Sequence, residues 1–70
     1  MLRMTAERQR QELSQAEIAR RAVMHPSTIS SVESGYITPS IGQLAKIAAA
    51  LDWKGEPAAL LGDVSTDAEH

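Results

Sequence analysis

The stretch from residue 14 to residue 35 constrains the fold most, because it holds the start and stop signals of two short helices. Ser14 opens an S-x-x-E capping box, in which a hydroxyl and a carboxylate each satisfy an unpaired N–H of the first turn. Small and apolar side chains then recur at helical spacing up to about Val23. A second helix is predicted from Pro26, since proline suits the first helical position, to just before Gly35, which suits the position after a helix end.

The rest of the chain predicts three more helices and no strand. Residues 2–12 lack glycine and proline and are rich in helix formers, so they predict a first helix. Ser40 opens a second capping box, after which apolar residues recur at helical spacing, namely Ile41, Leu44, Ile47, Ala48 and Leu51. Pro57 can open a last short helix that ends at Gly62. The sequence therefore predicts an all-α fold of five helices.

Length and composition limit the chain to one small domain. Seventy residues allow a single core, and the absence of cysteine excludes disulfides and thiolate metal sites. No apolar run approaches the length of a membrane span, and no charged-then-apolar leader is present. We therefore expect a cytoplasmic protein with no membrane contact, metal or cofactor. Its compact domain should cover residues 1–62, followed by an acidic flexible tail at 63–70.

The charges are unevenly distributed along the chain. Residues 1–51 carry six Lys and Arg against four Glu, a net of +2, whereas residues 52–70 carry one Lys against five acids, a net of −4. Phosphate neutralisation by Lys and Arg supplies most of the sequence-independent affinity for DNA. Composition alone therefore does not suggest a nucleic-acid partner.

The two closely joined helices at 14–35 point to DNA more directly. Such a pair is typical of a helix-turn-helix, which places its second helix in the major groove. Ile29 and Val32 are expected to face the core, which turns the serines outward, namely Ser27, Ser30, Ser31 and Ser34. Short serine side chains would let the helix backbone approach DNA closely. A plain solvated surface is the alternative interpretation.

Three blocks of the sequence, LSQAEIARRA, HPSTISSVESG and TPSIGQLAKIAAAL, resemble the lambda-repressor-like (Cro/repressor, Xre) helix-turn-helix family over roughly Met4 to Leu61. The resemblance implies a symmetric dimer on a palindromic operator, with the helix from Pro26 as the recognition helix. By motif position, it implies base contacts for Pro26, Ser27 and Ser31. It also implies phosphate or sugar-phosphate contacts for Gln15, Thr28 and Ser34.

The chain departs from the family pattern at its turns. Val23 stands where glycine is usual, and Glu12 replaces a frequent helix-ending glycine. A β-branched residue at positive φ is strained, so either the turn is built differently or it stores about 1 kcal/mol or more. Ser31 stands where Arg or Gln is frequent. One hydroxyl distinguishes bases less decisively than these bidentate side chains.

Several other side chains keep two interpretations. Tyr36 either packs in its loop or donates a hydrogen bond to phosphate, and Arg20 and Arg21 either form a solvated face or contact phosphate. His25 precedes Pro26, where an N-cap belongs, so a capping role is expected rather than catalysis.

Two tertiary features are also predicted. Arg8 and Glu33 occupy positions that pair in the family, and Glu33 lies toward the inward side of its helix, so we expect a partly buried ion pair. A group of C-terminal apolar side chains exceeds what five short helices readily cover, which predicts a two-fold dimer interface made of Trp53, Leu60, Leu61 and Val64.

These features together predict a sequence-specific DNA-binding transcriptional regulator, a repressor, and no enzyme. The sequence offers no nucleophile with a base, no carboxylate dyad and no phosphate-cradling glycine loop. Two alternatives remain open. The chain could be an antitoxin or controller that represses its own operon while a protein partner binds another surface. It could also be a protein-interaction module that has lost its DNA affinity.

Overall fold

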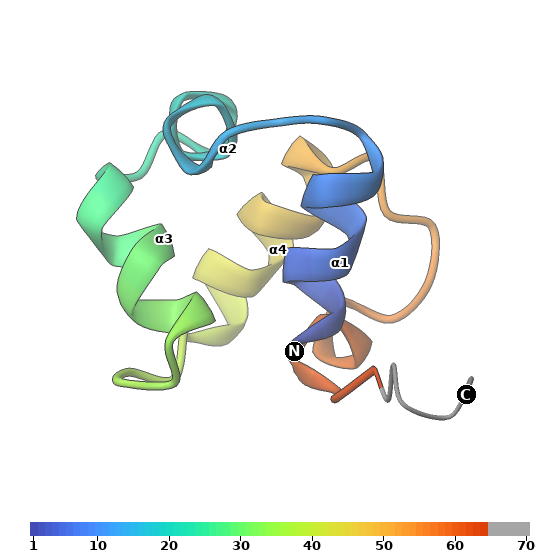
Figure 1. Ribbon diagram of the computed structural model, residues 1–70. Coiled ribbons are helices and arrows are strands. Elements are labelled where there is room, and N and C mark those ends of the chain that lie inside the picture. Colours follow the sequence, from blue (N-terminus) through green and yellow to red (C-terminus); the bar gives the residue numbers. More distant parts are fainter. Residues whose placement is uncertain (65–70) are drawn as a thin grey trace.

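The structure is a computed structural model, and it describes residues 1–64. This part of the chain folds into four α-helices and one 3-10 helix, which are α1 (Arg3–Arg10), α2 (Gln15–Ala22), α3 (Pro26–Glu33), α4 (Ile41–Ala50) and η1 (Pro57–Leu61). In Figure 1, α4 lies between α1 and α3. α2 packs on both α3 and α4, and η1 packs on α4 and α1. The expected helical fold is confirmed.

The expected count of five α-helices is not met, because the last element is a 3-10 helix. It spans only five residues and begins at Pro57, which has no backbone N–H to donate. Gly62, at its end, is extended and does not continue the turn. A segment so short is commonly 3-10, since it gains few bonds from the longer α-helical spacing.

Local capping signals explain where the central helices begin. Ser14 Oγ accepts a 3.0 Å hydrogen bond from the backbone N–H of Glu17. At α4 the capping box is complete, since Ser40 Oγ accepts from the backbone N–H of Gln43 (3.1 Å) and the Gln43 side chain accepts from that of Ser40 (3.0 Å). At α2 the box is one-sided, because the Glu17 carboxylate binds two arginines of its own helix instead.

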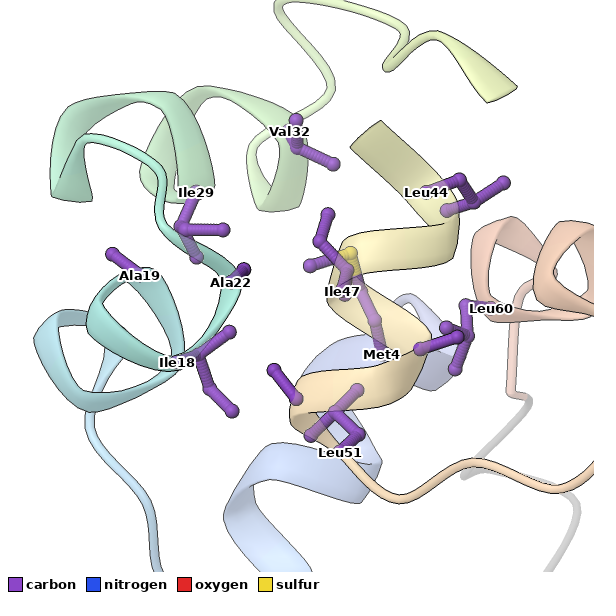
Figure 2. Packing of buried hydrophobic residues seen from close by; sticks show 12 residues of the cluster. Met4, Ile18, Ala19, Ala22, Ile29, Val32, Leu44, Ile47, Leu51 and Leu60 are labelled. Carbon is purple, nitrogen blue, oxygen red and sulfur yellow. The ribbon is translucent and has the colours of Figure 1, made fainter. Parts of the chain in front are cut away.

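The core takes buried side chains from every helical element. The largest fully buried ones are Met4, Ile18, Ile29, Val32, Ile47, Leu51 and Leu60. Figure 2 shows the two side chains of α3 facing α2 and α4, as the helical spacing predicted. Small alanines of α2 in the same cluster let the helices approach closely. α3 is therefore held through one face only.

Ile41 lies outside this core, contrary to the stripe expected for α4. It is the first residue of the helix and is 89% exposed. The other members of the stripe, from Leu44 to Leu51, are buried. Helical spacing predicts which side a residue faces, but it does not predict whether a neighbouring element reaches the end of the helix.

The two ends of the described segment lie side by side. Leu2 and Asp63 form an isolated antiparallel bridge, Arg3 N–H donates to the Gly62 carbonyl (2.8 Å), and Val64 N–H donates to the Met1 carbonyl (2.9 Å). The first two residues of the expected tail are thus paired with the start of the chain. The remainder of that tail, 65–70, lies outside the described residues. Nowhere in residues 1–64 is a helix both long and apolar enough to span a bilayer.

Candidate nucleic-acid interface

The outward side of α3 is lined by short hydroxyl side chains. Ser27 and Ser34 are exposed, and Ser30 and Ser31 are half-buried, whereas Ile29 and Val32 are buried on the other side. Pro26 is exposed, and Thr28 is half-buried. The helix thus offers hydroxyl groups that both donate and accept, on a surface without long side chains.

The first turn of α3 is capped by a histidine. His25 Nδ1 accepts a hydrogen bond from the backbone N–H of Ser27 (3.2 Å), so the imidazole takes the role that Ser, Thr, Asp or Asn usually has. The same nitrogen lies 2.8 Å from Ser27 Oγ. The sequence predicted a cap at this position but gave no signal for the bond to the Ser27 hydroxyl.

A shared carboxylate ties α3 to the elements before it. Arg8 of α1 donates from Nε (2.8 Å) and Nη2 (3.1 Å) to the two oxygens of Glu33, and its Nη1 donates to the Leu13 carbonyl (2.8 Å). Gln15, the first residue of α2, donates from Nε2 to the same carboxylate (2.9 Å). The side chains of Arg8 and Glu33 are only 14% and 6% exposed. The ion pair that the sequence predicted is therefore present and largely shielded from water.

The contact of Gln15 with Glu33 was not anticipated. The sequence left Gln15 as either part of the polar cap of its helix or a phosphate ligand, and neither interpretation included Glu33. An amide nitrogen carries two N–H groups, and Glu33 occupies one of them. The second N–H and the amide oxygen remain to meet a ligand, with the side chain already oriented.

All four α-helices end in the same hydrogen-bonded turn. One of the two residues that follow each helix adopts positive φ. The backbone N–H groups there donate to carbonyls of the last helical turn, as in a Schellman motif. The four positive-φ residues are Glu12 (59°), Val23 (57°), Gly35 (84°) and Asp52 (56°). Val23 therefore adopts the positive φ that glycine usually has at this position. Of the two expectations for this turn, the strained one applies.

These features form a recognisable frame: two short helices packed together, a tight turn between them, and a second helix held through one face. A profile of the helix-turn-helix family matches residues 4–55, most of the chain. The chain belongs to this family, in its Cro/C1-type, Xre-like branch. Comparisons with curated proteins and with solved structures found no match.

Members of the helix-turn-helix family are DNA-binding regulators, so the cations around α2 and α3 bear on the interface. Arg20 and Arg21 both bind the carboxylate of Glu17, and Arg21 Nε lies 3.1 Å from it. Their hydrogen bonds, that of Arg20 first, hold the pKa of the Glu17 carboxyl below its ordinary value. The Glu17 carboxylate is therefore charged at neutral pH, and it pairs with both arginines at the end of α2.

The loop after α3 exposes apolar side chains on this helix-turn-helix domain. Tyr36 is 83% exposed, and its ring is not packed in the loop, which removes one of its two interpretations. Ile37 is also exposed, as is Ile41 at the start of α4.

The expected dimer residues are mostly covered within the protomer. Leu60 has 0% exposure, so it belongs to the core and cannot reach another copy; this corrects the interface expected from the sequence. Trp53 and Leu61 are half-buried against the core, and Trp53 Nε1 donates to the Glu56 carbonyl (2.9 Å). Val64 is also half-buried.

Side chains that could hold a metal ion do not cluster within residues 1–64. Residues 1–64 contain no group of three His, Asp or Glu side chains placed to hold a metal ion. They also enclose no pocket.

Proposed function

We propose that this chain is a transcriptional repressor that binds a palindromic operator as a homodimer, with α3 in the major groove of each half-site. The observation that carries the proposal is the anchoring of α3. One side is fixed by Ile29 and Val32 in the core, and its end is fixed by the bidentate Arg8–Glu33 pair. The opposite side is open and lined by hydroxyls short enough for close approach to base edges.

Within this docking, the exposed side chains divide into two roles. Pro26, Ser27 and Ser31 would meet base edges, and they are exposed or half-buried on the outward side of α3. The remaining candidates would hold the DNA backbone, namely Gln15, Thr28, Ser34 and Tyr36. The two halves of the dimer would set their recognition helices about one DNA turn apart, roughly 34 Å.

The test is selection of preferred duplexes from a random pool by wild type, Ser31→Ala and Gln15→Ala. We expect Ser31→Ala to change preference at one position of each half-site by about 1 kcal/mol, because a single hydroxyl contact is weaker than a bidentate pair. We expect Gln15→Ala to weaken binding to all sequences alike, since phosphate contacts carry no sequence information. An unchanged site and affinity for Ser31→Ala would contradict the docking.

A second candidate is an antitoxin- or controller-type autoregulator, in which another surface of the same domain binds a protein. The exposure of Tyr36, Ile37 and Ile41 favours it, because a protein partner could bury these apolar side chains. Replacing Ile41 by Ser should then abolish partner binding. DNA binding in Ile41→Ser should be unchanged, which separates this role from repression alone.

The third reading, an interaction module without DNA affinity, is distinguished by a gel-shift assay on random duplex at two salt concentrations. Sequence-independent binding that weakens as salt rises supports a DNA role. No shift at the lower salt concentration would favour the interaction module and overturn the repressor proposal.

A further inference from the structure

We propose that His25 fixes the Ser27 hydroxyl as a hydrogen-bond acceptor. Ser27 therefore reads the exocyclic amino group of a base, adenine N6 or cytosine N4, in the major groove. The inference rests on the proposed DNA-binding function and assigns a positioning role to His25. Neither the family nor the docking described above determines which way a serine hydroxyl points.

The argument begins with the backbone bond that caps α3. The backbone N–H of Ser27 can only donate, and it points at His25 Nδ1 at 3.2 Å. Nδ1 must therefore carry a lone pair and no proton. A neutral imidazole has one protonated nitrogen and one acceptor nitrogen, so the proton of His25 resides on Nε2.

The second step concerns the hydroxyl. Ser27 Oγ lies 2.8 Å from the same unprotonated Nδ1, whose single lone pair the hydroxyl and the longer backbone N–H bond then share. Two acceptors at 2.8 Å need a proton between them. The hydroxyl hydrogen must then point at His25. Ser27 Oγ is left with lone pairs only, and the residue is exposed on the outward side of α3.

The consequence follows from the groups that DNA displays. A free serine hydroxyl rotates and can meet either donors or acceptors, so it distinguishes bases poorly. A hydroxyl that is already donating can meet only a donor, and the donors in the major groove are the amino groups of adenine and cytosine. Ser27, whose free hydroxyl would distinguish bases poorly, is thus restricted by His25 to accepting a hydrogen bond.

The first experiment identifies the base pair concerned. Selection from a random pool with wild type and Ser27→Ala locates the position whose preference is lost. His25→Ser is the matched variant, because a serine N-cap still accepts from the first turn but no longer requires the Ser27 proton. We expect His25→Ser to bind its site with α3 intact and to show a relaxed preference at that one position.

The second experiment separates donor from acceptor recognition. Every base pair carries one exocyclic amino group and one purine N7 in the major groove. Two modified duplexes are made at the located pair, one lacking the amino group and one with 7-deazapurine, which lacks N7. We expect loss of the amino group to weaken wild type about fivefold more than Ser27→Ala. The 7-deaza duplex should affect both proteins equally.

Coupling of Ser27 to N7 instead, or an unchanged preference in His25→Ser, would overturn the inference while leaving the proposed function standing. A pool from which wild type enriches no site would overturn both. Long-range ¹H–¹⁵N correlation NMR of the free protein is an independent test of the tautomer. It should show His25 protonated on Nε2, and the opposite tautomer would also overturn the inference.

Discussion

At the scale of single residues, the conformation of Val23 has the clearest energetic consequence. Its φ of 57° lies in the left-handed region, and its side chain is 81% exposed, so it gains little from packing. A non-glycine residue in this region costs on the order of 1–3 kcal/mol, and β-branching places Val23 among the less suited residues. The turn between α2 and α3 therefore holds strain that a substitution can release.

Val23→Gly should raise the free energy of unfolding by about 1 kcal/mol, because released strain exceeds the extra entropy that glycine gives the unfolded chain. The corresponding rise in Tm is roughly 4–8 °C for a domain of this size. Thermal unfolding measures it. Ala45→Gly is the control, since Ala45 is also exposed but lies inside α4, where glycine should destabilise. A Val23→Gly protein with wild-type or lower Tm would show that this turn is unstrained.

Glu17 gives a second prediction at this scale. It binds Arg20 and Arg21, and because their hydrogen bonds lower its pKa, the stabilising ion pairs are complete at neutral pH and are lost as pH falls through that lowered value. Glu17→Gln frees both arginines at neutral pH. Wild type should show a shallow salt dependence, about three to five phosphates per dimer. The variant should bind DNA more tightly, with a steeper slope of log affinity against log salt.

The matched control is Glu7→Gln, which changes the charge equally by releasing Arg10 of α1. Arg10 belongs to α1 and to neither helix of the helix-turn-helix, so this variant should change the slope less. Equal slopes for the two variants would mean that the arginines of α2 do not approach DNA phosphates.

At the scale of elements, the Arg8–Glu33 pair connects α1 to α3 across the domain. Arg8→Ala leaves Glu33 with only the Gln15 amide as a partner in a site where it is 6% exposed. We expect a loss of about 2–4 kcal/mol, since a stranded buried charge is strongly destabilising. Denaturant unfolding measures it, with Arg10→Ala, which breaks an exposed pair, as a control expected to be near wild type. Wild-type stability in Arg8→Ala would refute the structural role.

The same scale shows which elements the sequence could predict. The starts of α2, α3 and α4 follow from Ser14, Pro26 and Ser40, because capping depends on residues within one turn. The 3-10 form of η1 and the exposure of Ile41 depend on which elements pack nearby, and no local pattern encodes that.

In the candidate interface, the outward serines followed from helical spacing. The Gln15–Glu33 and His25–Ser27 bonds depend on three-dimensional placement and hydroxyl rotation.

At the scale of the whole molecule, the complete burial of Leu60 narrows the proposed dimer surface to Trp53, Leu61 and Val64. Sedimentation should show a dimer at high micromolar concentration, on its own or on DNA. Val64→Lys should shift that equilibrium toward monomer while its far-UV circular dichroism stays that of wild type. A wild type that sediments only as monomer under both conditions would overturn the dimer, and with it the palindromic operator.

The bridge between Leu2 and Asp63 has a practical consequence for building with this domain. Because these two residues are paired, a polypeptide attached before the first helix and one attached directly after residue 64 would leave the domain at almost the same place. That place lies beside α1 and η1, away from α3 (Figure 1). A fluorescent protein or a second binding module could therefore be joined at either end without obstructing the serine-lined helix. A short peptide joining the two ends would give a circular permutant whose new ends could be opened in the loop between α4 and η1.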